Sequence, residues 1–123
     1  MADGKDLEKS REMARLAVEA LEAKKGEDIR VIDISEISTL GDYFIIASGS
    51  SRPQLNALRD EVDERLGRAG YPAKSIEGGD NAKWILMDFG DIIVHIFDKE
   101  NRLFYDLERI WRDGKEVKPE EIG

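Results

Sequence analysis

The stretch Trp84-Ile-Leu-Met-Asp-Phe-Gly-Asp-Ile-Ile-Val-His-Ile-Phe97 predicts an antiparallel β-hairpin. Aliphatic and aromatic residues dominate two runs, Trp84–Asp88 and Asp91–Phe97. The dipeptide Phe89-Gly90 between them has the length of a two-residue hairpin loop. We therefore take Phe89-Gly90 as the loop and use it to assign the faces of the two strands.

Cross-strand partners share a face, so this loop sorts the hairpin into two sets of side chains. In this register the opposed pairs are Asp88 with Asp91, Leu86 with Ile93, and Trp84 with His95. The wholly apolar set is predicted to build the core: Ile85, Met87, Ile92, Val94 and Ile96. The other set is mixed: Trp84, Leu86, Asp88, Asp91, Ile93, His95 and Phe97. Because carboxylates and an imidazole are costly to bury without partners, we expect the mixed set to face solvent or a binding partner in part.

Helical and strand patterns alternate outside the hairpin. Helical spacing of apolar residues predicts helices over 3–25 and 52–68, with Gly26 ending the first and Ser51 and Pro53 beginning the second. Strands are expected at 29–34, 42–48 and 74–77, and a short helix at 101–112. This order predicts an α/β (α+β) fold with a mixed sheet of about five strands and packed helices. Residues 1–113 would form one domain, and 114–123 a flexible C-terminal tail.

Composition limits the class of protein. Of the 123 residues, 41% are hydrophobic and 37% charged, which is typical of a soluble globular domain, and no apolar run reaches the ~20 residues of a membrane span. The first residues carry no apolar segment of the kind that a secretory signal needs, and the chain has no cysteine. We therefore expect a cytoplasmic protein without disulfides.

The charge balance bears on the partner. The chain has 19 basic and 27 acidic residues, a net charge of −8, and its basic residues are interleaved with acids. Such a field repels phosphate backbones, so little direct nucleic-acid contact is expected and a basic protein partner is favoured. Solubility alone is an alternative reason for the acidity.

Three patterns in the sequence could indicate an enzyme. Asp88 and Asp91 in opposed positions could hold a metal, but aspartates beside a glycine are common turn residues. His95 has no cysteine or second histidine to complete a metal site, and stacking on Trp84 with half of its surface exposed is the expected role. Gly49-Ser50-Ser51 before a helix resembles a phosphate cradle, but the lysine of a P-loop is absent. We therefore predict no catalytic site, no metal and no cofactor.

Separated motifs occur along the chain in a characteristic order. They are Asp42-Tyr43-Phe44-Ile45-Ile46-Ala47-Ser48-Gly49, Ser51-Arg52, Glu77-Gly78 ahead of Trp84, Asp88 to Phe97, and Tyr105-Asp106-Leu107-Glu108-Arg109-Ile110-Trp111. Together they resemble the ribosomal silencing factor family, also called Iojap-related proteins. The resemblance covers roughly residues 5 to 112 and departs from the family's pattern only mildly, at Ser48-Gly49-Ser50, where a threonine is frequent.

The resemblance implies both a fold and a function. It implies a topology similar to that of nucleotidyltransferases without their catalytic metal pair. It also implies binding to the large ribosomal subunit through that subunit's ribosomal protein fourteen, which hinders subunit joining and represses translation when nutrients are scarce. No cofactor is implied.

Aromatic and acidic residues of this region are the candidate contacts with the ribosomal protein. Aromatic anchors with apolar neighbours dominate interface energetics, and acidic rim residues would suit a basic partner. The predicted set is Trp84, Leu86, Asp88, Asp91, Ile93, His95, Tyr105, Asp106, Leu107, Glu108 and Trp111. For each aromatic the alternative is a place in the core. Two other functions stay open at this point: a nucleotide-binding or nucleotidyltransferase-like enzyme, and a module that forms homodimers.

Overall fold

Two helices and six strands make up the described part of the chain. The computed structural model describes residues 2–36, 41–78, 83–99, 114–118 and 122. The elements are α1 (Ala2–Ala23), β1 (Glu27–Asp33), β2 (Tyr43–Gly49), α2 (Arg52–Arg68), β3 (Ser75–Glu77), β4 (Trp84–Asp88), β5 (Ile92–Asp98) and β6 (Lys115–Val117). The predicted mixed α/β class is confirmed. None of the described helices is long and apolar enough to span a membrane.

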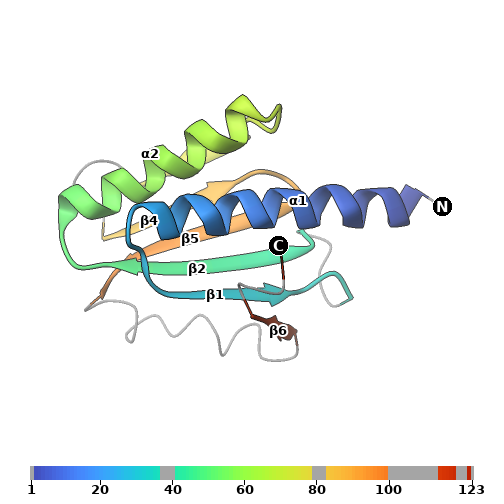
Figure 1. Ribbon diagram of the computed structural model, residues 1–123, viewed down its shortest axis with the longest axis horizontal. Helices are drawn as coiled ribbons and strands as arrows, with labels where there is room; N and C mark the ends of the chain where they lie inside the picture. The colour runs from blue at the N-terminus through green and yellow to red at the C-terminus, as the bar shows by residue number, and fades with distance from the viewer. Residues whose placement is uncertain (1, 37–40, 79–82, 100–113, 119–121, 123) are drawn as a thin grey trace.

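The strands form one mixed sheet in the order β3-β4-β5-β2-β1-β6. β2 and β5 pair in parallel at the centre, and the other neighbours pair antiparallel. Both helices pack on the same face, as Figure 1 shows. Their apolar residues form the main core with the inward set of the sheet, which includes the predicted Ile85, Met87, Ile92, Val94 and Ile96. Within the described part of the chain, neither helix packs on the other face of the sheet.

A left-handed residue ends α1. The Gly26 N–H donates to the Leu21 carbonyl at 2.8 Å and the Lys25 N–H to that of Glu22 at 3.0 Å, the pattern of a Schellman motif. The position that favours glycine in this motif is Lys25, with φ of 62°, and not the predicted Gly26. A lysine therefore holds a backbone conformation that costs it free energy.

Replacing this lysine is expected to stabilise the protein. Lys25→Gly should raise the free energy of unfolding by about 0.5–1 kcal/mol, because glycine removes the left-handed strain but adds freedom to the unfolded chain. Urea unfolding followed by circular dichroism measures the difference. Lys24→Gly is the control, since Lys24 precedes the left-handed residue; it should lose stability, because it also removes the ion pair of Lys24 with Glu61. A gain equal to that of Lys25→Gly would contradict the explanation.

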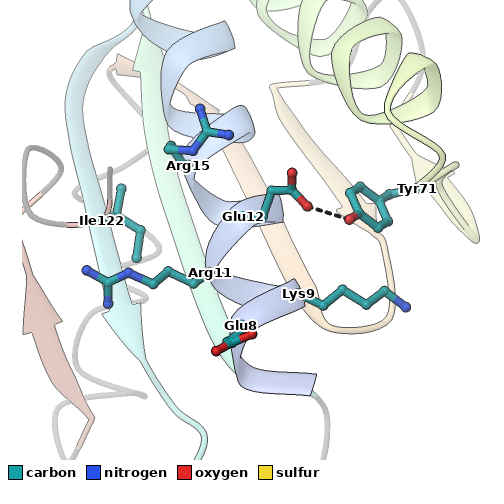
Figure 2. A pocket seen from close by; sticks show the side chains of 7 residues that line it. All are labelled: Glu8, Lys9, Arg11, Glu12, Arg15, Tyr71 and Ile122. Atoms are coloured by element: carbon teal, nitrogen blue, oxygen red, sulfur yellow. Dashed lines mark hydrogen bonds between the residues drawn. The ribbon is translucent and has the colours of Figure 1, made fainter. Parts of the chain in front are cut away.

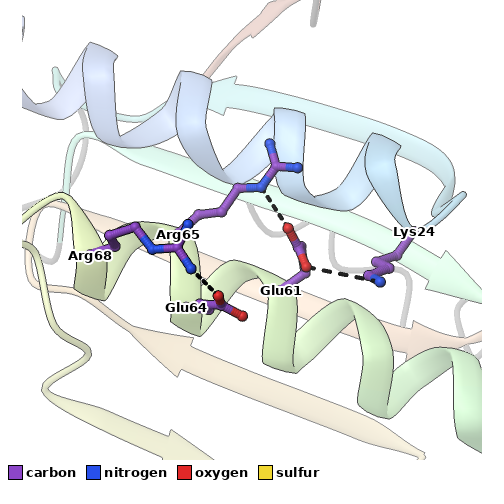
Figure 3. Close-up of polar contacts among 5 residues, drawn as sticks. All are labelled: Lys24, Glu61, Glu64, Arg65 and Arg68. Carbon is purple, nitrogen blue, oxygen red and sulfur yellow. Dashed lines mark hydrogen bonds and ion pairs between the residues drawn. The ribbon is translucent and has the colours of Figure 1, made fainter.

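α2 begins and ends as its sequence predicts. The Ser51 hydroxyl accepts a hydrogen bond from the Gln54 N–H at 3.2 Å, and Pro53 lies in the first turn. An ion pair of 4.0 Å joins Lys24, just past the end of α1, to Glu61 of α2, and Glu61 also accepts a bond of 2.6 Å from Arg65 (Figure 3). The hydrogen bond from Arg65 lowers the pKa of Glu61, so this carboxylate stays charged between the helices.

The hairpin differs from its prediction by two residues in register. The Phe89 N–H donates to the Ile92 carbonyl at 3.0 Å, so the loop is Gly90-Asp91 and not Phe89-Gly90. Gly90 takes a φ of +89°, which suits a glycine in a tight turn. The opposed pairs are Trp84 with Phe97, Leu86 with His95, and Asp88 with Ile93. An even shift keeps every strand residue on its predicted face, because side chains alternate with period two.

The segment expected to be a loose tail contributes to the fold. Lys115–Val117 pairs antiparallel with β1 as the sixth strand, and Val117 packs against the main core. Ile122 is 2% exposed within that core. The sheet therefore extends beyond the boundary at residue 113 that the sequence suggested.

Candidate partner-binding face

The sheet face opposite the helices has a small core of its own. Its buried hydrophobic residues are Ile32, Ile34, Phe44, Ile46 and Phe97, with exposed fractions of 0–5%, and half-buried Trp84 packs against them. They come from β1, β2, β4 and β5 and the residue after β1. We call this the second face.

Among the described residues, four aromatic rings stack along the second face. The Phe44 and His95 ring centroids are 4.3 Å apart, and those of His95 and Trp84 5.7 Å. Phe97 lies 5.5 Å from Trp84 and 6.1 Å from His95, with ring planes within 14° of parallel in both pairs. Such contacts add stabilisation beyond the burial of area. The predicted stacking of His95 on Trp84 is confirmed.

His95 lies in the interior of this stack and is not half-exposed as predicted. Only 5% of its surface is accessible. Burial lowers its pKa to about 4, so the imidazole is neutral near pH 7. Its Nδ1 accepts a hydrogen bond of 2.9 Å from Trp84 Nε1, which puts the remaining ring proton on Nε2. His95 therefore contacts Trp84 at the N–H edge of the indole and presents little surface to a partner.

A half-exposed patch lies beside the stack, where the sheet approaches its β3 edge. Leu86 is opposite His95 in β5 and Glu77 in β3, and Asp88 is opposite Ile93. Trp84, Leu86, Asp88 and Ile93 are all half-buried, and Glu77 is exposed. We call these five residues the β4–β5 patch. It combines a tryptophan and two aliphatic side chains with two carboxylates, the composition of an interface centre with an acidic rim.

Asp91 does not belong to this patch. It lies in the hairpin loop, and its carboxylate forms an ion pair of 3.5 Å with Lys9 of α1, on the helix side of the sheet. Asp88 Oδ1 accepts a bond of 2.8 Å from the Gly90 N–H. The two aspartates are therefore not opposed, and each has a role in or near the turn. Within the described ranges no group of three or more histidine and acidic residues is arranged to hold a metal.

The motif residue Asp42 ties α1 and the hairpin loop to the start of β2. Its carboxylate accepts a hydrogen bond of 2.5 Å from the buried Ser10 hydroxyl. Its N–H donates to the Asp91 carbonyl at 2.7 Å, and a Cβ at neighbouring Gly41 would come within 3.2 Å of the same oxygen. These contacts give Asp42 and Gly41 a structural role at this junction.

The resemblance to a phosphate cradle at Gly49-Ser50-Ser51 has a structural explanation. Gln54 Oε1 accepts from the Ser50 N–H at 2.8 Å and from the Ser50 hydroxyl at 3.2 Å. Gln54 Nε2 donates to the Lys25 carbonyl at 2.8 Å. A side-chain amide thus occupies both donors of Ser50 and links the loop to the end of α1.

A cavity of about 620 Å³ borders α1, away from the second face. It is lined by Glu8, Lys9, Arg11, Glu12, Arg15, Tyr71 and Ile122. Figure 2 shows Lys9 and Tyr71 on one side of α1, and Arg11 and Ile122 on the other. The Tyr71 hydroxyl donates to Glu12 at 2.5 Å, a bond that raises the tyrosine pKa, and Arg15 pairs with Glu19 at 3.0 Å. Because charges of both signs alternate around it, the cavity favours no ligand class.

Some predicted contacts fall outside the described residues. These are Tyr105, Asp106, Leu107, Glu108 and Trp111, together with the expected helix at 101–112. Among the described residues, the prediction missed Phe44 and Glu77 as members of the second face. Alternation along Tyr43–Ser48 separates Phe44 and Ile46 from Tyr43 and Ile45, but only the pairing of β2 with β5 places Phe44 against His95.

Comparison with known proteins gives consistent matches over most of the chain. The profile of the family described as "Ribosomal silencing factor during starvation" matches residues 7–123. The ribosomal silencing factor RsfS of Bacillus subtilis (strain 168) is 39% identical over 100 residues, covering 81% of this chain and 85% of that protein. The crystal structure of a Chromobacterium violaceum protein, 39% identical, superposes with a TM-score of 0.80 over 82% of this chain and 84% of that one.

A eukaryotic relative is matched over a part of its length. The mouse protein named "Mitochondrial assembly of ribosomal large subunit protein 1" is 32% identical over 99 residues, which cover 78% of this chain and 43% of the mouse protein. The family match includes all strands of the sheet and the whole β4–β5 patch.

Proposed function

Because the chain belongs to the ribosomal silencing factor family, we propose that it binds the large ribosomal subunit and represses translation by blocking subunit joining. The relatives support this proposal through their names: bacterial members are called ribosomal silencing factors, and the mouse protein is named for assembly of the large ribosomal subunit. In this proposal the factor acts in the cytoplasm under nutrient limitation, without a catalytic step. Its contact on the subunit is ribosomal protein fourteen, as the sequence resemblance implies.

The β4–β5 patch is the observation that supports a specific binding surface. Trp84, Leu86 and Ile93 offer half-exposed apolar area on a rigid sheet, and burial of such area drives association. Asp88 and Glu77 border it with negative charge, and the chain as a whole carries −8. Complementary charge would raise the rate of encounter with a basic ribosomal protein and discourage contact with RNA.

A charge introduced into the patch should abolish this function. We expect Leu86→Lys to weaken binding to large subunits at least ~30-fold, because it removes an apolar contact and puts a cation against a basic partner. Binding is measured by co-sedimentation with purified large subunits, and function by the fraction of subunits that join when small subunits are added.

Ile76→Lys is the matched control. Ile76 is an aliphatic residue of neighbouring β3, 39% exposed, and it is opposite Met87, so it lies on the helix side of the sheet. The affinity of the Ile76→Lys variant for large subunits should lie within about threefold of that of the wild type, as expected for a surface substitution outside the interface. Equal binding by the two variants would contradict the proposal that the β4–β5 patch binds the large subunit. Full subunit joining in excess wild-type protein would contradict the proposal that the protein blocks this joining.

A further inference from the structure

Two of the contacts that Trp84 makes with described residues bear on the orientation of its indole. Its indole stacks on Phe97 with centroids 5.5 Å apart and an interplanar angle of 14°. Its single N–H donates to His95 Nδ1 at 2.9 Å. The stack alone is compatible with two orientations of the indole that differ by a half-turn about the Cβ–Cγ bond, whereas a directional hydrogen bond at one edge selects one of them.

The His95 side chain is held in place by its neighbours. It is 5% exposed, lies in central strand β5 between β2 and β4, and stacks on Phe44 at 4.3 Å. Residue 95 is opposite Leu86 on one side and Ile46 on the other. An imidazole enclosed in this way has little freedom to move. The hydrogen bond therefore fixes the orientation of the indole relative to the imidazole.

We infer that His95 is a positioning residue, which accepts the Trp84 indole N–H and so orients the indole for contact with the ribosomal partner. This inference rests on the proposed function. It adds that Trp84 offers the partner the carbon surface of its ring and not a hydrogen-bond donor, because its N–H is already used. The partner group that fits such a surface is an aliphatic or cationic side chain.

The choice of histidine, rather than a hydrocarbon ring, follows from this role. Phenylalanine at position 95 would preserve the stack with Phe44 and Phe97 but offers no acceptor to the indole. Asparagine would lose the ring, yet its amide oxygen lies close to where Nδ1 is in histidine. The pair His95→Phe and His95→Asn therefore separates stacking from hydrogen bonding.

The hydrogen bond can be observed in the wild-type protein. In ¹⁵N-labelled protein, a scalar coupling should connect Trp84 Nε1 to His95 Nδ1 across the hydrogen bond, and the Trp84 indole proton should exchange slowly with water. Trp84→Phe assigns the signal, since the chain has two tryptophans and one histidine. Absence of the coupling together with exchange as fast as that of free indole would overturn the inference without any substitution at position 95.

Binding measurements then test the consequence. We expect His95→Phe to lower affinity for large subunits about five- to tenfold, the range of one hydrogen bond, with its circular dichroism spectrum unchanged. His95→Asn should recover more than half of that loss on a logarithmic scale. Equal losses in the two variants would assign His95 a purely structural role and overturn the inference.

Trp84→Ala distinguishes failure of the inference from failure of the proposed function. If Trp84→Ala loses binding while His95→Phe binds like wild type, the positioning role of His95 is wrong, but the proposal that the β4–β5 patch binds the large subunit is still supported. If Trp84→Ala binds like wild type, there is no contact to position, and both the inference and the proposed patch are overturned.

Discussion

Replacing Phe44 with alanine is expected to lower the free energy of unfolding by about 3–5 kcal/mol. Phe44 is 2% exposed and stacks on His95 at 4.3 Å. It belongs to β2, which pairs with β5 on one side and β1 on the other, so its backbone has little room to collapse into the space left by the ring. Urea unfolding followed by circular dichroism at pH 7 measures the loss.

Ile76→Ala is the control for this experiment. Ile76 is 39% exposed on edge strand β3 and should lose less than ~1 kcal/mol, because its side chain removes little area from water in the folded state. A loss below ~1.5 kcal/mol for Phe44→Ala would mean that the second face is not a true core and that its aromatic stack gives Trp84 no rigid support.

Local signals explain which parts of the fold the sequence predicts well. α2 (Arg52–Arg68) has its predicted bounds because Ser51 and Pro53 act on the helix start through hydrogen bonds and dihedral angles a few residues long. The prediction of which hairpin residues share a face is also confirmed. This prediction needs only the period of two along each strand, which a register error of two residues leaves intact.

Contacts between distant segments determine the parts of the fold that the sequence does not predict. The parallel pairing of β2 with β5 joins residues about fifty positions apart, and no local pattern specifies it. The same holds for Lys115–Val117, which has no strong strand propensity and becomes β6 by pairing with β1. Gln54 resembles an ordinary helix residue in sequence, yet its amide joins the Ser50 loop to the end of α1.

The candidate site shows the same difference between features set by local patterns and features set by contacts between distant segments. Trp84, Leu86, Asp88 and Ile93 are half-exposed on the second face, as alternation along the strands predicts. The predicted position of Asp91 is wrong because the loop lies one residue later than expected, and the Asp91 carboxylate pairs with Lys9. The burial of His95 could not be read from its own strand, because it depends on Phe44 and Trp84 from two other strands.

His95 should also make the stability of the protein depend on pH. Its pKa in the folded protein is about 4, against 6.5 in the unfolded chain, so the unfolded state binds a proton first as the pH falls. Stability is therefore lost progressively below about pH 6.5, and the loss levels off near pH 4, where the folded state also takes up the proton. The shift corresponds to a total of about 3 kcal/mol, of which about 2 kcal/mol falls between pH 7 and pH 5.

Comparison with His95→Phe isolates this contribution, because His95 is the only histidine in the chain. Carboxylates titrate alike in the two proteins, so the difference between their unfolding free energies should change by about 2 kcal/mol from pH 7 to pH 5, with the wild type losing more. The Trp84 N–H···Nδ1 coupling should persist at pH 5, because the folded imidazole is still neutral there. Parallel pH profiles for the two proteins would show that His95 titrates in the folded state as it does in the unfolded chain. That result would be incompatible with an imidazole enclosed by Phe44, Trp84 and Phe97.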